Sequence, residues 1–326
     1  MRSSNTMRSN TIEIMGGLGN QLFQIFALLA YSLRNKTPFY FSAQAIAHGA
    51  RKKTYWDTLF LQNLAPLVKP TPNSNTPHTQ HIYRESDFHY QPIPNTEQSL
   101  KLFGYFQSYK YFADHQENIY RLIRLRETQA KYKTSNSTIA YDKTIAMHFR
   151  VGDYAQLPNH HPLMTLEYYT QALTQFLKDQ QTANARASAL CETLEQVCET
   201  TEGERTAGER TWQILYFCEE PDQAYVETKL IMHIKANPLF KDKFTFQCID
   251  HQLDDWEQVI IMSLCKHHII ANSTFSWWGA YLGFGMRSEG DTHTPLVYYP
   301  RTWFGSAMGQ KNMNDLFPQH WRRINV

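Results

Sequence analysis

The segment from Thr11 to Arg34 constrains the fold more than any other part of the chain, because it combines a strand pattern, a glycine turn and a helix pattern. Residues 11–15 (TIEIM) are rich in β-branched side chains, and GGLGN follows from Gly16. Apolar residues then recur at helical spacing through QLFQIFALLAYSLR, and a second strand pattern, PFYFS, begins at Pro38. A strand, a helix and a strand in this order predict a parallel sheet and therefore an α/β protein.

The same alternation of strand and helix patterns returns in the second half. Strands are predicted at 144–149, 213–218 and 268–271, and helices at 166–177, at 255–265 and after residue 273. In the first half, residues 66–94 are rich in Pro, Asn, Thr and His and predict irregular connections. Two halves rich in βα units predict two Rossmann-like domains that face a cleft, residues 1–140 and 141–326.

Residues 181–211 differ in composition from the sequence around them. CET occurs twice, from Cys191 and Cys198, and GERT occurs twice, from Gly203 and Gly208. Few apolar residues follow Val197, so this segment is predicted to be a duplicated, mobile surface insertion. No set of metal ligands completes the two cysteines, and we expect no metal site there.

The composition excludes several classes of protein. The 326 residues contain 32 Lys and Arg against 30 Asp and Glu, a balance that gives no case for a nucleic-acid partner. Five cysteines at irregular spacing do not form a disulfide framework, which favours the cytoplasm. The N-terminus lacks the pattern of a secretory signal, and no run of about 18 apolar residues occurs, so a membrane-spanning segment is not expected.

The glycine turn is the first candidate for chemistry. Gly17 and Gly19 lie between a strand and a helix, where backbone amides at the helix N-terminus can meet an anion. A dinucleotide site is disfavoured, because Leu22 occupies the third glycine position and no acidic residue lies between Glu13 and Asp57 to hold a ribose. A plain tight turn and a site for an anion or a sugar both remain open, and the amides of Asn20 and Gln21 suit a hydroxylated ligand.

The sequence HFRVGDY, where the strand at 144–149 ends, is the second candidate. Strand alternation puts His148 and Arg150 on one face, at the carboxyl end where parallel sheets bind ligands. Arg150 can hold phosphate oxygens through two parallel hydrogen bonds, and Asp153 can act as a general base. The structural alternative is an ion pair between Arg150 and Asp153, with His148 as a core histidine whose hydrogen bonds are satisfied.

The third candidate is NSTFSWW, from Asn272 to Trp278. Four small polar side chains occupy a predicted turn from strand to helix, so hydroxyl groups and helix amides are expected to converge on one spot that suits phosphate. Helix capping alone needs only one of these side chains. Core packing is the better explanation for Trp277 and Trp278.

Taken in order, these motifs resemble those of the bacterial α-1,2-fucosyltransferases of glycosyltransferase family 11. The resemblance rests on GGLGNQLFQ from Gly16, HFRVGDY from His148, FCEE from Phe217 and ANSTFSWWGAYL from Ala271, and two weaker matches are FGYFQSYKYF and YYPRTWFG. It spans roughly residues 12–305, apart from the repeat insertion. The chain departs from the family pattern at Val151, where many members have a second basic residue, and at His268, where many have a small one.

The resemblance implies a GT-B architecture and an inverting transfer of L-fucose from GDP-β-L-fucose to the 2-hydroxyl of a terminal β-galactoside. No Asp-x-Asp sequence occurs, so no metal or other cofactor is expected, and protein groups must neutralise the leaving diphosphate. The expected partners are GDP-fucose and a galactose-terminated oligosaccharide or glycolipid, as in lipopolysaccharide synthesis. The expected location is the cytoplasm or, with peripheral membrane association, the cytoplasmic face of the inner membrane. The alternatives are another acceptor, or a sugar-binding or nucleotide-binding protein of this fold without turnover.

Taken with the resemblance, the candidate residues form three sets. The catalytic set is Arg150, Asp153 and His148. The donor-binding set is Arg150, His148, Glu219, Asn272, Ser273, Thr274, Phe275 and Ser276. The acceptor or cleft set is Gly17, Gly19, Asn20, Gln21 and Tyr154. Asp153 is the candidate base, and the alternatives are Glu219, Asp254, Asp255 or Glu257, or no dedicated base.

Overall fold

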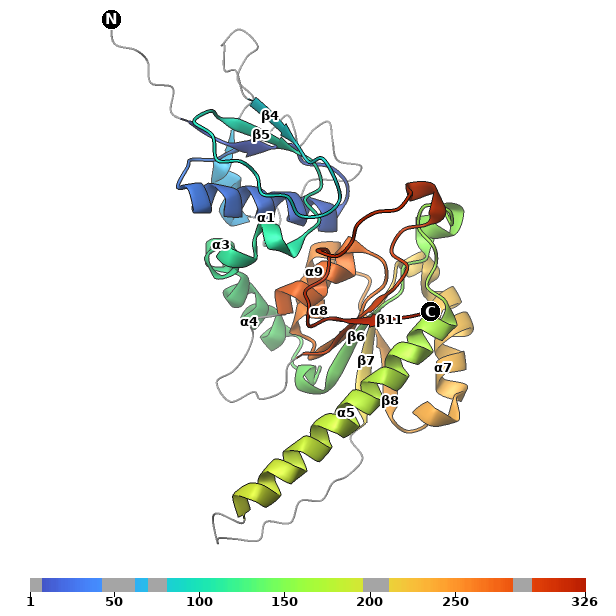
Figure 1. The fold of residues 1–326 in the computed structure, drawn as a ribbon. Coiled ribbons are helices and arrows are strands. Elements are labelled where there is room, and N and C mark those ends of the chain that lie inside the picture. Colours follow the sequence, from blue (N-terminus) through green and yellow to red (C-terminus); the bar gives the residue numbers. More distant parts are fainter. Residues whose placement is uncertain (1–7, 43–61, 70–80, 196–210, 284–294) are drawn as a thin grey trace, which may run out of the picture.

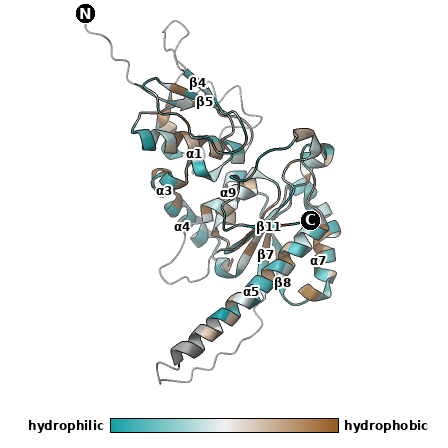
Figure 2. Cartoon of the chain, viewed as in Figure 1, coloured by the Kyte–Doolittle hydropathy of each residue, from teal (hydrophilic) through white to brown (hydrophobic). Residues whose placement is uncertain are grey.

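The fold is described from a computed structural model, which covers residues 8–42, 62–69, 81–195, 211–283 and 295–326. These residues form an α/β protein with parallel sheets in each half (Figure 1). The predicted α/β fold class is confirmed. The brown, hydrophobic colour gathers on strands such as β7 of the larger sheet, while helices such as α4 carry much teal on their outer faces (Figure 2).

The first half contains a three-stranded sheet in the order β1-β5-β4, which comprises β1 (Thr11–Ile12), β5 (Leu100–Phe103) and β4 (His81–Arg84). All of its pairings are parallel. A second pair, β2 (Phe41–Ser42) with β3 (Val68–Lys69), is parallel too, and a parallel bridge between Asn10 and Phe39 links the two sheets. The predicted strand–helix–strand opening is therefore present, although its strands are short.

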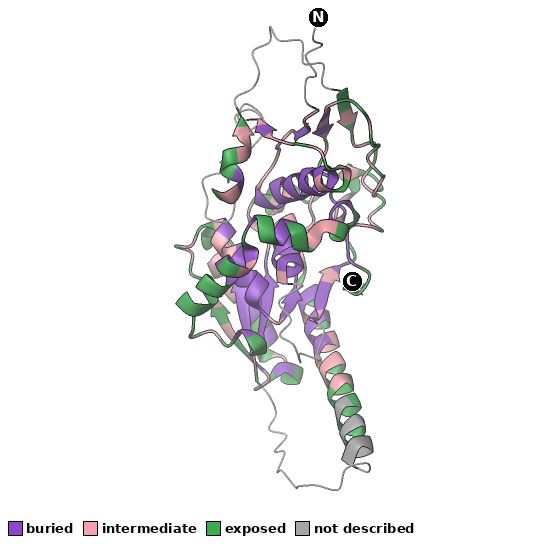
Figure 3. Ribbon diagram, turned by 90° about the vertical axis from the view of Figure 1, so that its left-hand side faces the viewer, coloured by how far each residue is buried: buried purple, intermediate pink, exposed green. Residues whose placement is uncertain are grey.

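Helix α1 (Leu18–Asn35) covers this sheet and is buried from Gln21 to Ser32 on nearly every side (Figure 3). The turn before it requires a glycine, because Gly16 has a φ of 79°, in the left-handed region. The side chain of Gln24 fixes the same turn by accepting a hydrogen bond from the Met15 amide at 2.8 Å.

The second half contains a six-stranded parallel sheet in the order β11-β10-β9-β6-β7-β8. Its strands are β6 (Thr144–His148), β7 (Trp212–Phe217), β8 (Phe244–Cys248), β9 (His267–Ile269), β10 (Val297–Pro300) and β11 (Arg322–Ile324). Its helices are α5 (Leu166–Glu195), α6 (Gln223–Tyr225), which continues through a π-helix (Val226–Ile231) into α7 (Met232–Ala236), α8 (Asp255–Leu264) and α9 (Thr274–Gly283). The carboxyl ends of β6, β7 and β9 are thus neighbours.

Two helices before residue 140 contact the second half. These are α3 (Gln116–Leu122) and α4 (Leu125–Ser135). The Tyr120 hydroxyl donates to the Tyr281 carbonyl at 3.2 Å, and the Gln129 amide donates to the Ser263 hydroxyl at 2.9 Å. The domain boundary near residue 140 stays a prediction, and these contacts show that the segment just before it is packed on α8 and α9.

The two halves meet where α1 packs against α9. The rings of Phe23 and Trp277 lie 4.5 Å apart, as do those of Phe26 and Trp278. Both tryptophans are completely buried, so their predicted role in core packing is confirmed. The Trp278 indole also donates to the Gly19 carbonyl at 2.8 Å, which ties the first turn of α1 to α9.

One prediction about an irregular segment is wrong. Residues 81–84 lie inside the stretch predicted to be irregular, but they pair with β5 as strand β4, because a partner strand supplies the hydrogen bonds that local sequence does not reveal. Residues 181–195 begin the predicted surface insertion, and they extend α5, which is already helical from Leu166. The mobile surface insertion stays a prediction. The remainder of the repeat, 196–210 with Cys198, lies outside the described residues.

Within the described ranges, no helix is both long enough and apolar enough to cross a bilayer.

The contact at Gly19 generates a stability prediction. A Cβ at Gly19 would lie 2.5 Å from the Thr274 carbonyl carbon and 2.7 Å from the Phe275 nitrogen, so we expect Gly19→Ala to destabilise the fold by about 1–3 kcal/mol. Gly17→Ala is the matched control, because no atom lies within 4 Å of a Cβ there. We expect it to cost at most about 1 kcal/mol, through the helix cap. Equal free energies of unfolding for the two variants in urea titrations would contradict the close approach.

Candidate functional site

The three sequence motifs meet where the two halves touch. The Thr274 hydroxyl donates to Asn20 Oδ1 at 3.1 Å, which joins the glycine turn to the start of α9. The Tyr154 hydroxyl donates to the Asn272 carbonyl at 3.2 Å, and the His148 ring lies 5.2 Å from that of Phe275. The structure thus places residues 16–21, 148–154 and 272–278 around one region of the seam.

Arg150 follows the end of β6 and carries the positive charge of this region. Its guanidinium forms ion pairs with Glu219, just beyond the end of β7, and with Asp153 at 2.5 Å. The same group lies 5.0 Å from the centre of the Tyr154 ring. Burial lowers the pKa of Arg150, but the charges of Glu219 and Asp153 outweigh this effect and leave the pKa raised, so Arg150 stays charged.

The pair between Arg150 and Asp153 is the one that the structural alternative for HFRVGDY predicted. Asp153 and Glu219 are 58% and 46% exposed at their side chains, against 20% for Arg150. An anionic ligand can therefore approach from the solvent side and exchange with either carboxylate. Gly152, with a φ of 27°, shapes the loop, and its amide donates to Asp222 Oδ2 at 2.8 Å.

His148 is a buried histidine that is held neutral. Burial and, to a lesser degree, the charge of Arg150 lower the pKa of His148 to about 3. Its Nδ1 is buried and has no hydrogen-bond partner within the part of the chain that the structure describes. The structural alternative, a core histidine whose hydrogen bonds are satisfied, therefore fails at this nitrogen.

The hydroxyl groups of the turn 272–276 do not converge on one spot, which differs from the expectation based on the sequence. The Thr274 hydroxyl points toward Asn20, and the completely buried Ser276 hydroxyl donates to the Ser273 carbonyl at 3.2 Å. Ser273 Oγ caps the helix by accepting from the Phe275 amide at 3.3 Å. Phosphate binding by these three hydroxyls stays a prediction, and it requires the Thr274 and Ser276 bonds to be exchanged.

Asn272 is the member of this turn with spare capacity. Its side-chain nitrogen donates to the carbonyls of Pro162 at 3.0 Å and Trp303 at 3.2 Å. Its Oδ1 is buried and lacks a hydrogen-bond partner among the described residues. Together with His148 Nδ1, this gives the region two buried polar atoms that lack hydrogen-bond partners among the described residues.

The predicted acceptor residues of the glycine turn differ in exposure. Asn20 is half-buried and accepts from both Thr274 and the Gln107 amide, the latter at 2.8 Å. Gln21 is buried, and its side chain donates to the Gly16 carbonyl at 3.0 Å. Gly19 lies against α9, whereas Gly17 borders open space. Of the four, Gly17 and Asn20 are the better placed to meet a ligand.

Three of the alternative carboxylates have structural roles. The Asp254 carboxylate and the Glu257 carboxylate form a capping box at the start of α8, and Glu257 also accepts from the Tyr132 hydroxyl at 2.5 Å. Asp255 belongs to the same first turn. This leaves Asp153 and Glu219 as the candidate bases that border the Arg150 region.

A hollow of about 220 Å³ lies at the seam and was missed by the sequence analysis. It is lined by residues 85–88, which directly follow β4, and by Lys311 from the second half. Glu85 accepts from the amides of Tyr105 and Phe106 at 2.8 and 2.9 Å, yet its other oxygen is buried without a hydrogen-bond partner in the described ranges. Burial raises the pKa of Glu85. No local motif marks this site, because β4 itself went unrecognised.

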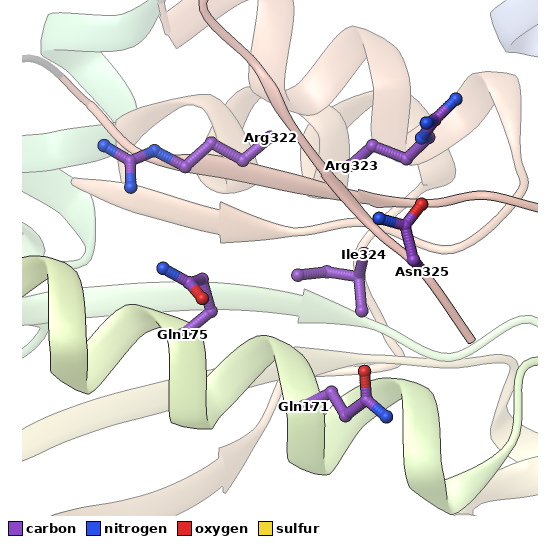
Figure 4. Close-up of a pocket in the computed structure, with 6 residues that line it drawn as sticks. All are labelled: Gln171, Gln175, Arg322, Arg323, Ile324 and Asn325. Atoms are coloured by element: carbon purple, nitrogen blue, oxygen red, sulfur yellow. The ribbon is translucent and has the colours of Figure 1, made fainter.

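A second hollow, of about 390 Å³, lies between α5 and edge strand β11 (Figure 4). Arg322, at the amino end of β11, is one of its lining residues, and its charge is already paired with Asp179. None of the residues that line this hollow belongs to the three motifs. It is therefore not the candidate site.

The buried histidines generate a prediction on pH. The pKa of His268, like that of His148, is lowered to about 3 by burial, whereas an unfolded histidine titrates near pH 6.5. The unfolded chain therefore binds protons first, and stability falls as the pH drops from about 6.5 toward 3, by about 2 kcal/mol per histidine at about pH 5. We measure the free energy of unfolding in urea titrations at about pH 7 and about pH 5. Between these two pH values, it should fall by about 2 kcal/mol less in His148→Gln than in the wild type.

The matched control is His160→Gln, because His160 is exposed. In this variant, the free energy of unfolding should fall between about pH 7 and 5 by as much as in the wild type. An equal loss in His148→Gln and in the wild type would show that His148 is not held neutral.

The family comparison matches a segment within the second half of the chain. The model of glycosyl transferase family 11 matches residues 240–296, a range that contains β8, α8, β9 and α9. The NSTFSWW turn therefore lies inside the matched segment.

Two curated proteins of Escherichia coli are similar over a longer range. An α-1,2-colitosyltransferase is 24% identical over 232 residues, which is 69% of this chain and 63% of that protein. The O-antigen biosynthesis glycosyltransferase WbnK is 26% identical over 224 residues, which is 66% of this chain and 58% of that protein. Both alignments thus span less than two thirds of the relative.

Among solved structures, a variant of Arabidopsis thaliana FUT1 in complex with GDP matches with a TM-score of 0.41 and 10% identity, over 85% of this chain and 68% of that one. The family model and the two curated relatives confirm that this chain resembles glycosyltransferase family 11, as its motifs predicted.

Proposed function

We propose that this protein is an inverting glycosyltransferase that moves L-fucose from GDP-β-L-fucose to the 2-hydroxyl of a terminal β-galactoside, without a metal ion. The observation that carries the proposal is Arg150, a charged guanidinium at the carboxyl end of a parallel strand, paired with two half-exposed carboxylates that a diphosphate can replace. The similarity to two glycosyltransferases supports the reaction class.

Arg150 suits a leaving diphosphate because its charge is held by partners that can give way. Asp153 and Glu219 both pair with the guanidinium, and both are half-exposed, so either carboxylate can turn toward solvent. A diphosphate oxygen that takes over one of the paired positions gains a charge-assisted bond in a partly buried place, where such bonds are strong. His148 Nδ1 can bond to a phosphate oxygen or a sugar hydroxyl, and Asn272 Oδ1 can accept from a sugar hydroxyl.

The proposed step is a single displacement. The galactose 2-hydroxyl oxygen forms a bond to the fucose anomeric carbon while the bond from that carbon to the β-phosphate oxygen breaks. GDP leaves with the electron pair, and Arg150 stabilises its growing charge. The hydroxyl proton passes to a base, for which Asp153 is our candidate. No atom of this step requires a divalent ion.

The acceptor is proposed to bind on the side of the first half. The hollow beside β4 offers a carboxylate oxygen of Glu85 and the Phe88 ring, the two kinds of group that sugars use for hydrogen bonds and stacking. The Arg150 guanidinium lies over the Tyr154 ring, and the rings of Tyr154, His161 and Phe304 then follow one another. The ring centres of Phe304 and Phe88 lie 5.0 Å apart. This row connects the donor and acceptor positions along the seam.

A second donor is favoured by one observation. One similar protein is an α-1,2-colitosyltransferase, and colitose is fucose without its 3-hydroxyl. GDP-colitose therefore belongs beside GDP-fucose in the assay. The ratio of the two kcat/KM values decides which sugar this chain transfers.

The first functional prediction concerns Arg150. With GDP-fucose and a panel of β-galactosides, we expect the wild type to form a fucosyl-α1,2-galactoside. Arg150→Ala should lower kcat by about 10²–10³, the usual cost of one preorganised donor. Transfer is followed by product chromatography, and the linkage is read by NMR.

Two controls accompany this assay. Arg301→Ala removes an exposed arginine that follows β10, and it should retain wild-type kcat. Mg²⁺ or Mn²⁺ added to protein treated with a chelator should leave kcat unchanged. Absence of transfer from either sugar nucleotide to any galactoside would overturn the proposed activity, and activation by Mg²⁺ or Mn²⁺ would overturn metal independence.

The second functional prediction concerns Asp153. If Asp153 accepts the proton, Asp153→Asn lowers kcat by about 10²-fold or more and leaves the KM for the donor nearly unchanged. If Asp153 only orients Arg150, the donor KM rises while kcat stays close to that of the wild type. Steady-state kinetics over a range of donor concentrations separate these outcomes, and the second outcome eliminates Asp153 as the base.

A further inference from the structure

Three side chains that the proposed reaction does not use lie together at the edge of the larger sheet. Cys218 directly follows β7, Cys248 ends β8, and His251 lies in the turn after β8. Because β7 and β8 are parallel neighbours, with Tyr216 opposite Cys248, their carboxyl ends share one edge. The two sulfurs and one imidazole nitrogen all lie within 4.8 Å of one another.

The spacing of these atoms suits a tetrahedral metal ion. Zinc binds sulfur at about 2.3 Å and imidazole nitrogen at about 2.0 Å, so two ligands of a tetrahedron lie about 3.6–3.8 Å apart. Cys248 Sγ and His251 Nε2 are 3.7 Å apart, which is the length of such an edge. An ion can therefore enter between these two atoms with little movement of either side chain.

Burial and access also suit a metal site. Cys218 is only 5% exposed, while Cys248 and His251 are half-buried, so one ligand is fixed in the protein and two face an approach from solvent. His251 Nε2 lies 3.2 Å from the Cys218 carbonyl oxygen and 3.7 Å from Cys248 Sγ, so this nitrogen faces both cysteines.

We propose that Cys218, Cys248 and His251 form a site for one thiophilic divalent metal ion, of which Zn²⁺ is the type, with a fourth position open to water. On binding, the two thiols release two protons to solvent and form two metal–sulfur bonds. The imidazole moves its proton from Nε2 to Nδ1 and stays neutral, and the third bond forms to Nε2. No electrons are transferred.

The consequence for the chain is structural. Glu219, the partner of Arg150, follows Cys218 directly, so an ion at this site holds the end of β7 against the turn after β8. Thiolate ligands select soft ions rather than Mg²⁺, and the site is therefore separate from any ion that would serve a diphosphate. The proposal does not rest on the proposed transferase activity.

The experiment titrates Co²⁺ into the full-length, metal-free protein under reducing conditions. We expect one Co²⁺ per chain, with the near-ultraviolet band of a thiolate-to-cobalt charge transfer and the strong visible bands of a four-coordinate ion. Zn²⁺ should displace Co²⁺ and abolish these bands.

Variants identify the ligands. Cys248→Ser and His251→Asn should weaken Co²⁺ binding by about 10²-fold or more, and Cys248→Ser should reduce the charge-transfer band. Cys265→Ser is the matched control, because Cys265 is a buried free cysteine outside the cluster, and it should leave the band unchanged. His251 is half-exposed, so His251→Asn keeps the test decisive if a cysteine variant does not fold. A wild type without the charge-transfer band, or undiminished affinity in both variants, would overturn the site.

Discussion

The packing of α1 against α9 is the interaction on which the rest of the structure depends. Phe23 and Phe26 meet Trp277 and Trp278 in a contact from which water is excluded, and burying side chains of this size is worth about 1.5–3 kcal/mol each. The Trp278 bond to the Gly19 carbonyl fixes the register of the two helices. Because the candidate residues of the glycine turn and of the turn 272–276 lie at the starts of these two helices, this packing also sets that part of the site.

Arg150 is a partly buried positive charge that two carboxylates compensate. A guanidinium so near the interior would be costly without partners, and Glu219 and Asp153 compensate it. Both partners are half-exposed, so the compensation is reversible by an anion from solvent. Nearby, His148 avoids the cost of a second buried cation by staying neutral.

Much of the second half could be predicted from local pattern. The segments around β6, β7, β9 and α9 have apolar runs that end in polar turns, and such runs identify buried parallel strands and their helices. Strand β4 could not be recognised, since HIYR lies in a polar stretch and is ordered by its pairing with β5. The Cys218–Cys248–His251 cluster left only one local trace, the C-x-x-H spacing from Cys248, because the pairing of β7 with β8 supplies its third member.

The sequence by itself determined the α/β class, the glycine turn before α1 and the three motifs of the site, because each of these depends on periodicity or on the conformational needs of neighbouring residues. Only the tertiary structure decided which groups meet. Arg150 pairs with Glu219 across 69 positions of sequence, and Asn20 bonds to Thr274 across 254. Such pairings follow from strand order and helix packing, which depend on the burial of the whole apolar surface rather than on any local segment.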